Sequence, residues 1–99
     1  MEQIKKLWEQ HEQASFPAGH RNKTIEGVNL TLIDTELSGF VLTFISTGGS
    51  LGARQHIALE KGISTLTKII PQLEDDAKPY FQHLLDLCKK ILKESHPPK

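Results

Sequence analysis

Four side chains in the first third of the chain belong to the types most often used in binding and catalysis: His11, Glu12, Arg21 and Asp34. Asp34 falls in a strongly apolar stretch, and a buried carboxylate needs a partner because an unpaired buried charge is costly. Arg21 can offer two parallel hydrogen bonds to such a carboxylate. We therefore favour a structural ion pair between Asp34 and Arg21, with a solvated Asp34 as the next interpretation. A ligand-binding site formed by all four residues is the third.

The five histidines raise the question of a metal site. His56 lies four residues before Glu60, and His83 lies three residues before Asp86, so each pair can share a helix face. A zinc site, however, needs three or four convergent ligands, and no recognised spacing such as H-E-x-x-H occurs in the chain. We therefore predict no metal site and no cofactor, and we expect these pairs to be ordinary surface contacts.

Other features resemble functional motifs without completing one. The segment T-G-G-S-L-G at 47–52 lacks the G-K-[ST] and G-x-G-x-x-G patterns of phosphate-binding loops, so a turn between helices is the simpler interpretation. The sequence around Cys88 does not resemble that of a base-activated thiol, and Cys88 falls on an apolar face, which is typical of a small buried hydrophobe. Gly39 and Gly62 lie within helical patterns, where each costs about 1 kcal/mol relative to alanine, and indicate close packing. We predict no catalytic residue.

Four stretches with helical spacing of apolar residues must position these side chains, near 2–14, 30–46, 52–70 and 74–94. Asn29 is a good N-cap for the second stretch, and Gly48-Gly49 supplies its stop. Because that stretch is apolar nearly all round, we expect it to be the central, buried helix. Residues 16–29 then form a long loop over the outside, with a short extended piece at 24–25. The predicted fold is a mostly helical, compact bundle.

The second stretch also admits a different fold. Apolar and polar residues alternate from Val28 to Leu32, and F-V-L-T-F-I at 40–45 is rich in strand formers. The alternative prediction is therefore an α+β fold with a β-hairpin at 28–46.

Composition limits the class of protein. With 99 residues, of which 37% are hydrophobic, the chain is sized for a single domain spanning 1–99, and we expect 95–99 to be a frayed tail. Twelve basic residues balance twelve acidic ones, so no global positive field favours nucleic acid. The single cysteine suits a reducing compartment, and no apolar run approaches the ~18 residues of a membrane span. We expect a cytoplasmic protein with no membrane partner.

Five short motifs run through most of the chain: L-W-x-x-H-E-x-x-S-F-P at 7–17, G-V-N-L-x-L-I-D at 27–34, G-G-x-L at 48–51, I-P-x-L at 70–73 and P-Y-F-x-x-L at 79–84. In this order they resemble a family of small uncharacterised bacterial proteins. The chain departs from the family pattern at two positions, where the relatives carry Asp in place of Asn29 and Cys in place of Phe40. The resemblance implies a mostly helical fold and brings no known activity, substrate or catalytic residue.

The leading functional hypothesis is a non-enzymatic interaction or regulatory module whose helix faces or long loop bind another protein. Its positive sign is Trp8 on the apolar side of the first predicted helix, since exposed aromatic residues favour interfaces. The alternative is a small ligand-binding protein or enzyme with a polar site under the 16–29 loop, which requires His11 and Asp34 to converge. A third hypothesis is a homodimer in which 28–46 completes its burial across a two-fold axis.

Overall fold

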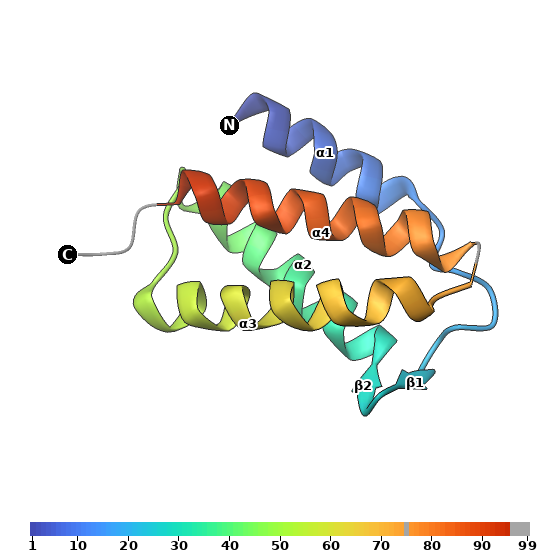
Figure 1. Cartoon of the computed structure of the whole chain (residues 1–99). Coiled ribbons are helices and arrows are strands. Elements are labelled where there is room, and N and C mark those ends of the chain that lie inside the picture. The colour runs from blue at the N-terminus through green and yellow to red at the C-terminus, as the bar shows by residue number, and fades with distance from the viewer. Residues whose placement is uncertain (75, 96–99) are drawn as a thin grey trace.

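Helices joined by turns and one small hairpin make up the protein (Figure 1). In the computed structural model, which describes residues 1–74 and 76–95, the elements are α1 (Glu2–Gln13), β1 (Thr24–Ile25), β2 (Val28–Asn29), α2 (Leu30–Ser46), α3 (Ala53–Ile69), the 3-10 turn η1 (Ile70–Gln72) and α4 (Ala77–Glu94). The prediction of a mostly helical fold with four main helices is confirmed. The alternative of a hairpin at 28–46 is wrong, because 30–46 is one continuous helix.

The two ends of α2 explain why this ambiguous segment is a helix. The Asn29 side chain caps the first turn by accepting a hydrogen bond from the Leu32 amide at 3.0 Å. At the other end Gly48 and Gly49 have φ angles of 73° and 113°, which glycine adopts without the steric cost that a Cβ would impose. The Gly49 amide donates to the carbonyl oxygen of Phe44 at 2.9 Å, so a carbonyl of the last turn is satisfied. The glycine segment is therefore a helix-ending turn, as predicted.

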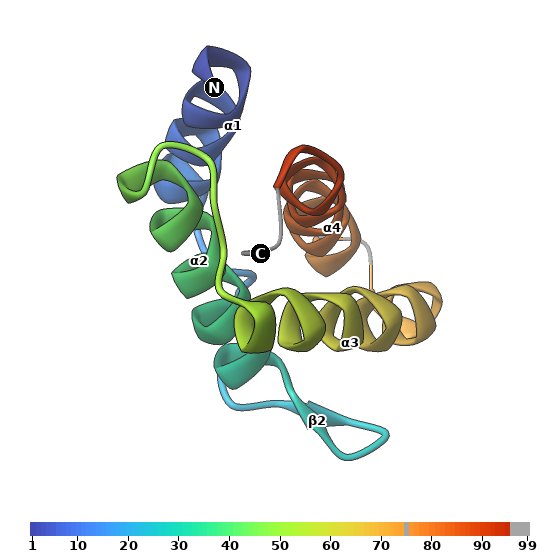
Figure 2. The ribbon, with the colours of Figure 1, turned by 90° about the vertical axis from the view of Figure 1, so that its left-hand side faces the viewer.

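The other three helices pack most extensively against α4 (Figure 2). Viewed nearly along the axis of α4, α1 and α2 lie on one side of it and α3 lies on another. The prediction that 30–46 would be the central helix is wrong. Because α2 crosses one side of the bundle, it keeps an outer face, on which Leu32 and Leu42 are 66% and 48% exposed.

The predicted long loop contains a small antiparallel hairpin, in which Thr24 pairs with Asn29 and Ile25 pairs with Val28. Its two-residue turn consists of Glu26 and Gly27, with φ angles of 49° and 80°. Positive φ at both central residues matches the right-handed twist of two short paired strands. The hairpin projects from the bundle near the start of α2 and leads the chain directly into that helix (Figure 2).

Of the two helical glycines, Gly62 alone lies at a close approach between helices. A Cβ at Gly62 would collide with Cδ2 of Leu37 on α2, whereas a Cβ at Gly39 would meet no atom within 4 Å. The prediction of close packing is confirmed for Gly62 and wrong for Gly39, which lies on the exposed face of α2.

The chain stays packed against the bundle just beyond the end of α4. Ser95, the first residue of the predicted frayed tail, is buried, and its amide donates to the carbonyl oxygen of Ile91 at 2.8 Å. The rest of that tail, 96–99, lies outside the described residues. None of the helices in the described part of the chain has both the length and the apolar character needed to cross a membrane.

Candidate functional site

Side chains from three helices meet around the carboxylate of Asp34. His11 of α1 donates from Nε2 to Oδ1 of Asp34 at 3.0 Å, and the hydroxyl of Tyr80 on α4 donates to Oδ2 at 3.0 Å. The side chain of Asp34, on α2, is 18% exposed, and that of His11 is 4% exposed. One polar network therefore joins α1, α2 and α4 at the edge of the core.

Each of the three residues borders an apolar stripe, which explains why all of them turn inward. His11 continues the buried face of α1, Asp34 follows the buried Ile33, and Tyr80 precedes the buried Phe81. Burial of the neighbouring apolar side chains carries the polar groups to the helix interface. There, hydrogen bonds between them replace those lost to water.

The contacts of Asp34 determine where the protons lie. An ionised carboxylate only accepts hydrogen bonds, so the Tyr80 hydroxyl and Nε2 of His11 both donate. In the neutral imidazole the proton is then on Nε2, and Nδ1 keeps its lone pair. Nδ1 of His11 is buried and has no hydrogen-bond partner in residues 1–74 and 76–95. Such orphan polar atoms are uncommon in folded proteins and call for an explanation.

Its surroundings keep Tyr80 protonated. Burial raises the pKa of the phenol well above its ordinary 10.0, the charge of Asp34 and the hydrogen bond to it raise the pKa further, and Arg21 acts in the opposite direction. Tyr80 is therefore a permanent hydrogen-bond donor near neutral pH. Its role in the network is to hold the carboxylate of Asp34.

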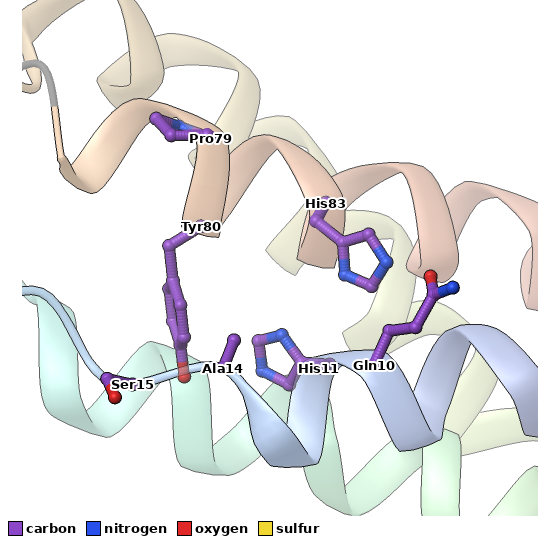
Figure 3. A pocket seen from close by; sticks show the side chains of 7 residues that line it. All are labelled: Gln10, His11, Ala14, Ser15, Pro79, Tyr80 and His83. Carbon is purple, nitrogen blue, oxygen red and sulfur yellow. The ribbon is translucent and has the colours of Figure 1, made fainter.

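A pocket of about 310 Å³ opens beside the network, between α1 and α4 (Figure 3). The ring planes of His11 and His83 are 12° apart and their centroids are 6.0 Å apart. The two rings are nearly parallel and offset, with a nitrogen of each on the side toward the other ring, while the Ser15 hydroxyl points away from them (Figure 3). The polar lining consists of Gln10, His11, Ser15, Tyr80 and His83, and Ala14 and Pro79 add apolar surface.

His83 presents a second free nitrogen to this region. Burial lowers the pKa of His83, the neighbouring His11 lowers it further, and Asp86 acts in the opposite direction. His83 is therefore neutral at pH 7, with one protonated and one unprotonated ring nitrogen. Its Nε2 is also buried without a partner.

The structure brings together two of the four predicted site residues. His11 and Asp34 are in direct contact, whereas Glu12 is exposed and forms no ion pair with any described residue. The favoured ion pair between Arg21 and Asp34 is wrong, because Arg21 forms no salt bridge with Asp34 among the described residues, and the carboxylate accepts from His11 and Tyr80 instead.

Arg21 lies over the ring of Phe16 instead, with Cζ 5.3 Å from the ring centroid. Phe16 packs edge-on against Tyr80, with centroids 5.4 Å apart. The 16–29 connection is therefore tied down by an aromatic contact, and not by the ion pair that the sequence suggested.

Nothing in the sequence marks Tyr80 and His83 as site residues. They lie three residues apart, so they share a face of α4, but this spacing is common to any helix and carries no chemical signal of its own. Their relevance comes from α1, which places His11 opposite them, with the His11 and Tyr80 ring centroids 4.7 Å apart.

The remaining predicted features are structural. His56 and Glu60 form the expected surface pair, with Nδ1 3.2 Å from Oε1, whereas Asp86 accepts from Gln82 at 2.9 Å and not from His83. Cys88 is fully buried, and burial, assisted by the charge of Asp34, raises the pKa of its thiol to about 12. Within residues 1–74 and 76–95, no group of three or more His, Cys, Asp or Glu side chains is placed to hold a metal ion.

Comparison of the chain with protein-family models, with curated proteins and with solved structures gives no match. The family resemblance stays a prediction. Function must therefore be argued from the site itself.

Proposed function

We propose that the protein is a ligand-binding helical module whose site is the pocket between α1 and α4. The observation that carries this proposal is the state of His11. Its ring is buried, its Nε2 is hydrogen-bonded to Asp34, and its Nδ1 has no partner among the residues that the structure describes. A ligand group that meets Nδ1 would remove the cost of that orphan acceptor.

The pocket suits a small ligand. Its volume of about 310 Å³ is at the lower end of the roughly 300–1,000 Å³ typical of ligand sites. The lining combines apolar surface from Ala14 and Pro79 with a few polar groups of fixed orientation, a combination that ligand sites share. His11 is held from behind by Asp34, which is itself held by Tyr80, so the binding nitrogen is preorganised.

Binding accounts for this geometry better than catalysis does. His11 has the orientation of a general base, because a carboxylate holds one of its nitrogens and leaves the other free. A nucleophile beside it would complete a catalytic set. The hydroxyl nearest in sequence, that of Ser15, points away from the ring (Figure 3).

Amide and imidazole chemical shifts of ¹⁵N-labelled protein would test the proposal. The probes are small hydroxyl- and amide-bearing aromatic molecules, such as phenol and benzamide, added one at a time. We expect at least one of them to shift the signals of Ala14, Tyr80 and His83 in the wild type and to leave those of a His11→Gln variant unchanged. His56→Gln, which alters a surface histidine outside the pocket, is the matched control. Shifts confined to other parts of the chain, or no shift at the pocket with either an organic probe or a metal ion, would contradict the proposal.

A second candidate function is self-association through the groove between α2 and α3. This groove, of about 390 Å³, is lined in part by Leu32, which is 66% exposed, and by Ile33, Glu36, Lys61 and Gly62. A two-fold interface brings the same patch of both copies together, so the opposite charges of Glu36 and Lys61 can pair reciprocally around the apolar Leu32.

Light scattering at several concentrations tests this second candidate. We expect the mass of the wild type to rise toward that of a dimer and the mass of Leu32→Glu to remain that of a monomer. A wild type that stays monomeric throughout would contradict it. In either function we place the protein in the cytoplasm, which the single, buried cysteine supports.

A further inference from the structure

Two ring nitrogens face each other across the pocket between α1 and α4 (Figure 3). We propose that His11 and His83 together bind one late-transition-metal ion of the Cu²⁺ or Zn²⁺ type, through Nδ1 of His11 and a ring nitrogen of His83. The inference rests on the proposed function, because it names the ligand class of the same pocket. It also differs from the prediction made from the sequence, which contains no recognised metal-binding spacing and led us to expect no metal site.

The surroundings of His11 are those of a metal ligand. Histidines that bind metals almost always donate their other ring N–H to a carboxylate or carbonyl, which fixes the tautomer and makes the free nitrogen more basic. Nε2 of His11 donates to Asp34 in this way at 3.0 Å, and Tyr80 holds the second oxygen of that carboxylate at 3.0 Å. Nδ1 is thereby left unprotonated in the neutral ring, and it is buried without a partner.

The separation of the two rings suits a shared ion. A Zn–N bond is about 2.0–2.1 Å and a ring nitrogen lies about 1.2 Å from the imidazole centroid, so two imidazoles on one ion have centroids at most about 6.5 Å apart. The centroids of His11 and His83 are 6.0 Å apart. The ring planes differ by only 12°, so the two imidazoles are nearly parallel. A single ion between the rings can therefore meet both.

The charges near the pocket favour a cation. The carboxylate of Asp34 is one hydrogen bond behind His11. A neutral imidazole such as that of His83 has one ring nitrogen with a lone pair that can bind a metal ion. Asp86, three residues after His83 on α4, adds negative charge on that side of the pocket.

The types of ligand select the class of metal. Imidazole nitrogens suit copper, nickel and zinc, whereas Ca²⁺ and Mg²⁺ take oxygen ligands. In the part of the chain that the structure describes, no third His, Cys, Asp or Glu joins the pair, so water or a small solute would complete the coordination. Affinity then follows the general order of these ions, with Cu²⁺ bound more tightly than Zn²⁺.

An organic ligand with one hydrogen-bond donor would explain the free nitrogen of His11 but not the position of His83. Such a donor needs a single acceptor, whereas two nitrogens turned toward the same point are the arrangement that one ion requires. The facing pair is therefore the observation that distinguishes a metal from other ligands of this pocket.

Titration of uniformly ¹⁵N-labelled wild-type protein with zinc sulfate tests the proposal without any substitution. Two-bond ¹H–¹⁵N spectra resolve both ring nitrogens of each histidine. We expect one equivalent of Zn²⁺ to shift Nδ1 of His11 and one nitrogen of His83 together, and to leave His20 and His56 unchanged. Shifts confined to His20 or His56, or no shift at any histidine, would overturn the proposal.

A matched pair of variants provides a second readout. His83→Gln removes one of the two proposed ligands and should weaken Cu²⁺ binding, measured by calorimetry, by at least about tenfold, since even the loss of a group behind a ligand costs about 10–100-fold. His56→Gln changes a surface histidine of α3 and should leave the affinity as in the wild type. Equal affinities for the two variants would contradict the assignment of His83. Mg²⁺ should produce no heat of binding with either.

The two proposals for this pocket fail separately. If Zn²⁺ leaves the imidazoles unchanged while phenol or benzamide shifts Ala14, Tyr80 and His83, the metal assignment is wrong and the ligand-binding function stands. If neither probe acts at the pocket, both are wrong. If Zn²⁺ shifts both His11 and His83, both stand.

Discussion

Tyr80 gives a direct optical test of the network around Asp34, because it is the single tyrosine of the chain. The absorbance of tyrosinate therefore reports on this residue alone. In the folded protein we expect little tyrosinate at pH 10, where a free phenol is half ionised, since burial and the charge of Asp34 raise the pKa of Tyr80.

Asp34→Asn is the perturbation that probes the network with the least change in shape. The carboxylate accepts two hydrogen bonds at 3.0 Å, whereas the amide has one accepting oxygen and carries no charge. A hydrogen bond to a charged group contributes about 1.5–3 kcal/mol. We therefore expect the variant to lose about 2 kcal/mol of unfolding free energy in urea titrations and to ionise Tyr80 at a lower pH than the wild type does.

Stability should also depend on pH in a defined direction. Tyr80 holds its proton more tightly in the folded protein than in the unfolded chain. Its contribution to the free energy of unfolding is therefore fully present below pH 10 and is lost as the pH rises above 10. The loss should be smaller in Asp34→Asn, because burial alone then raises the pKa of Tyr80.

Asp86→Asn is the matched control, because it makes the same chemical change on the exposed face of α4, where Asp86 accepts only from Gln82. It should shift neither the Tyr80 titration nor the stability by more than about 0.5 kcal/mol. Tyrosinate that forms near pH 10 in wild-type protein with intact helical circular dichroism would refute the bond between Tyr80 and Asp34. Equal stability of the two variants would do the same.

Three further predictions concern other parts of the molecule. Gly39→Ala should add about 1 kcal/mol to the unfolding free energy measured in urea, because the added methyl meets open space. Gly62→Ala should lower the unfolding free energy, because overpacking against Leu37 costs about 1–3 kcal/mol. A gain in stability at both positions would show that α2 and α3 are not in close contact at Gly62. Cys88 should react with a thiol reagent at pH 8 at least about 100-fold more slowly in native than in urea-unfolded protein, because its pKa is raised to about 12, and comparable rates would place the thiol at the surface. The pKa of His83 is lowered in the folded state, so the stability of the wild type should fall as the pH decreases through 6.5. His83→Gln should reduce this pH dependence, measured as urea midpoints on both sides of pH 6.5. An unchanged dependence in the variant would indicate that His83 is solvated.

Several features of the fold could be predicted because they depend on neighbours in the sequence. The N-cap at Asn29 and the glycine stop at Gly48-Gly49 are local devices, so the limits of α2 follow from the chain itself. Burial of Cys88 follows from its place in the apolar stripe of α4. Which helix is central cannot be predicted in this way, because it depends on how four amphipathic helices share their apolar faces. The sequence wrongly favoured α2 over α4.

The candidate site likewise has a part that could be predicted from the sequence and a part that could not. The sequence by itself placed His11 on an amphipathic helix and favoured a helix over a hairpin around Asp34. It also indicated that Asp34, if buried, needs a hydrogen-bonding partner, because an unpaired buried charge is costly. Tertiary structure alone decided that the partners are His11 and Tyr80, 23 and 46 residues away, and not Arg21. It also placed His83 opposite His11. The crossing of α1 and α4 over α2 sets these contacts, and that packing depends on every apolar face at once.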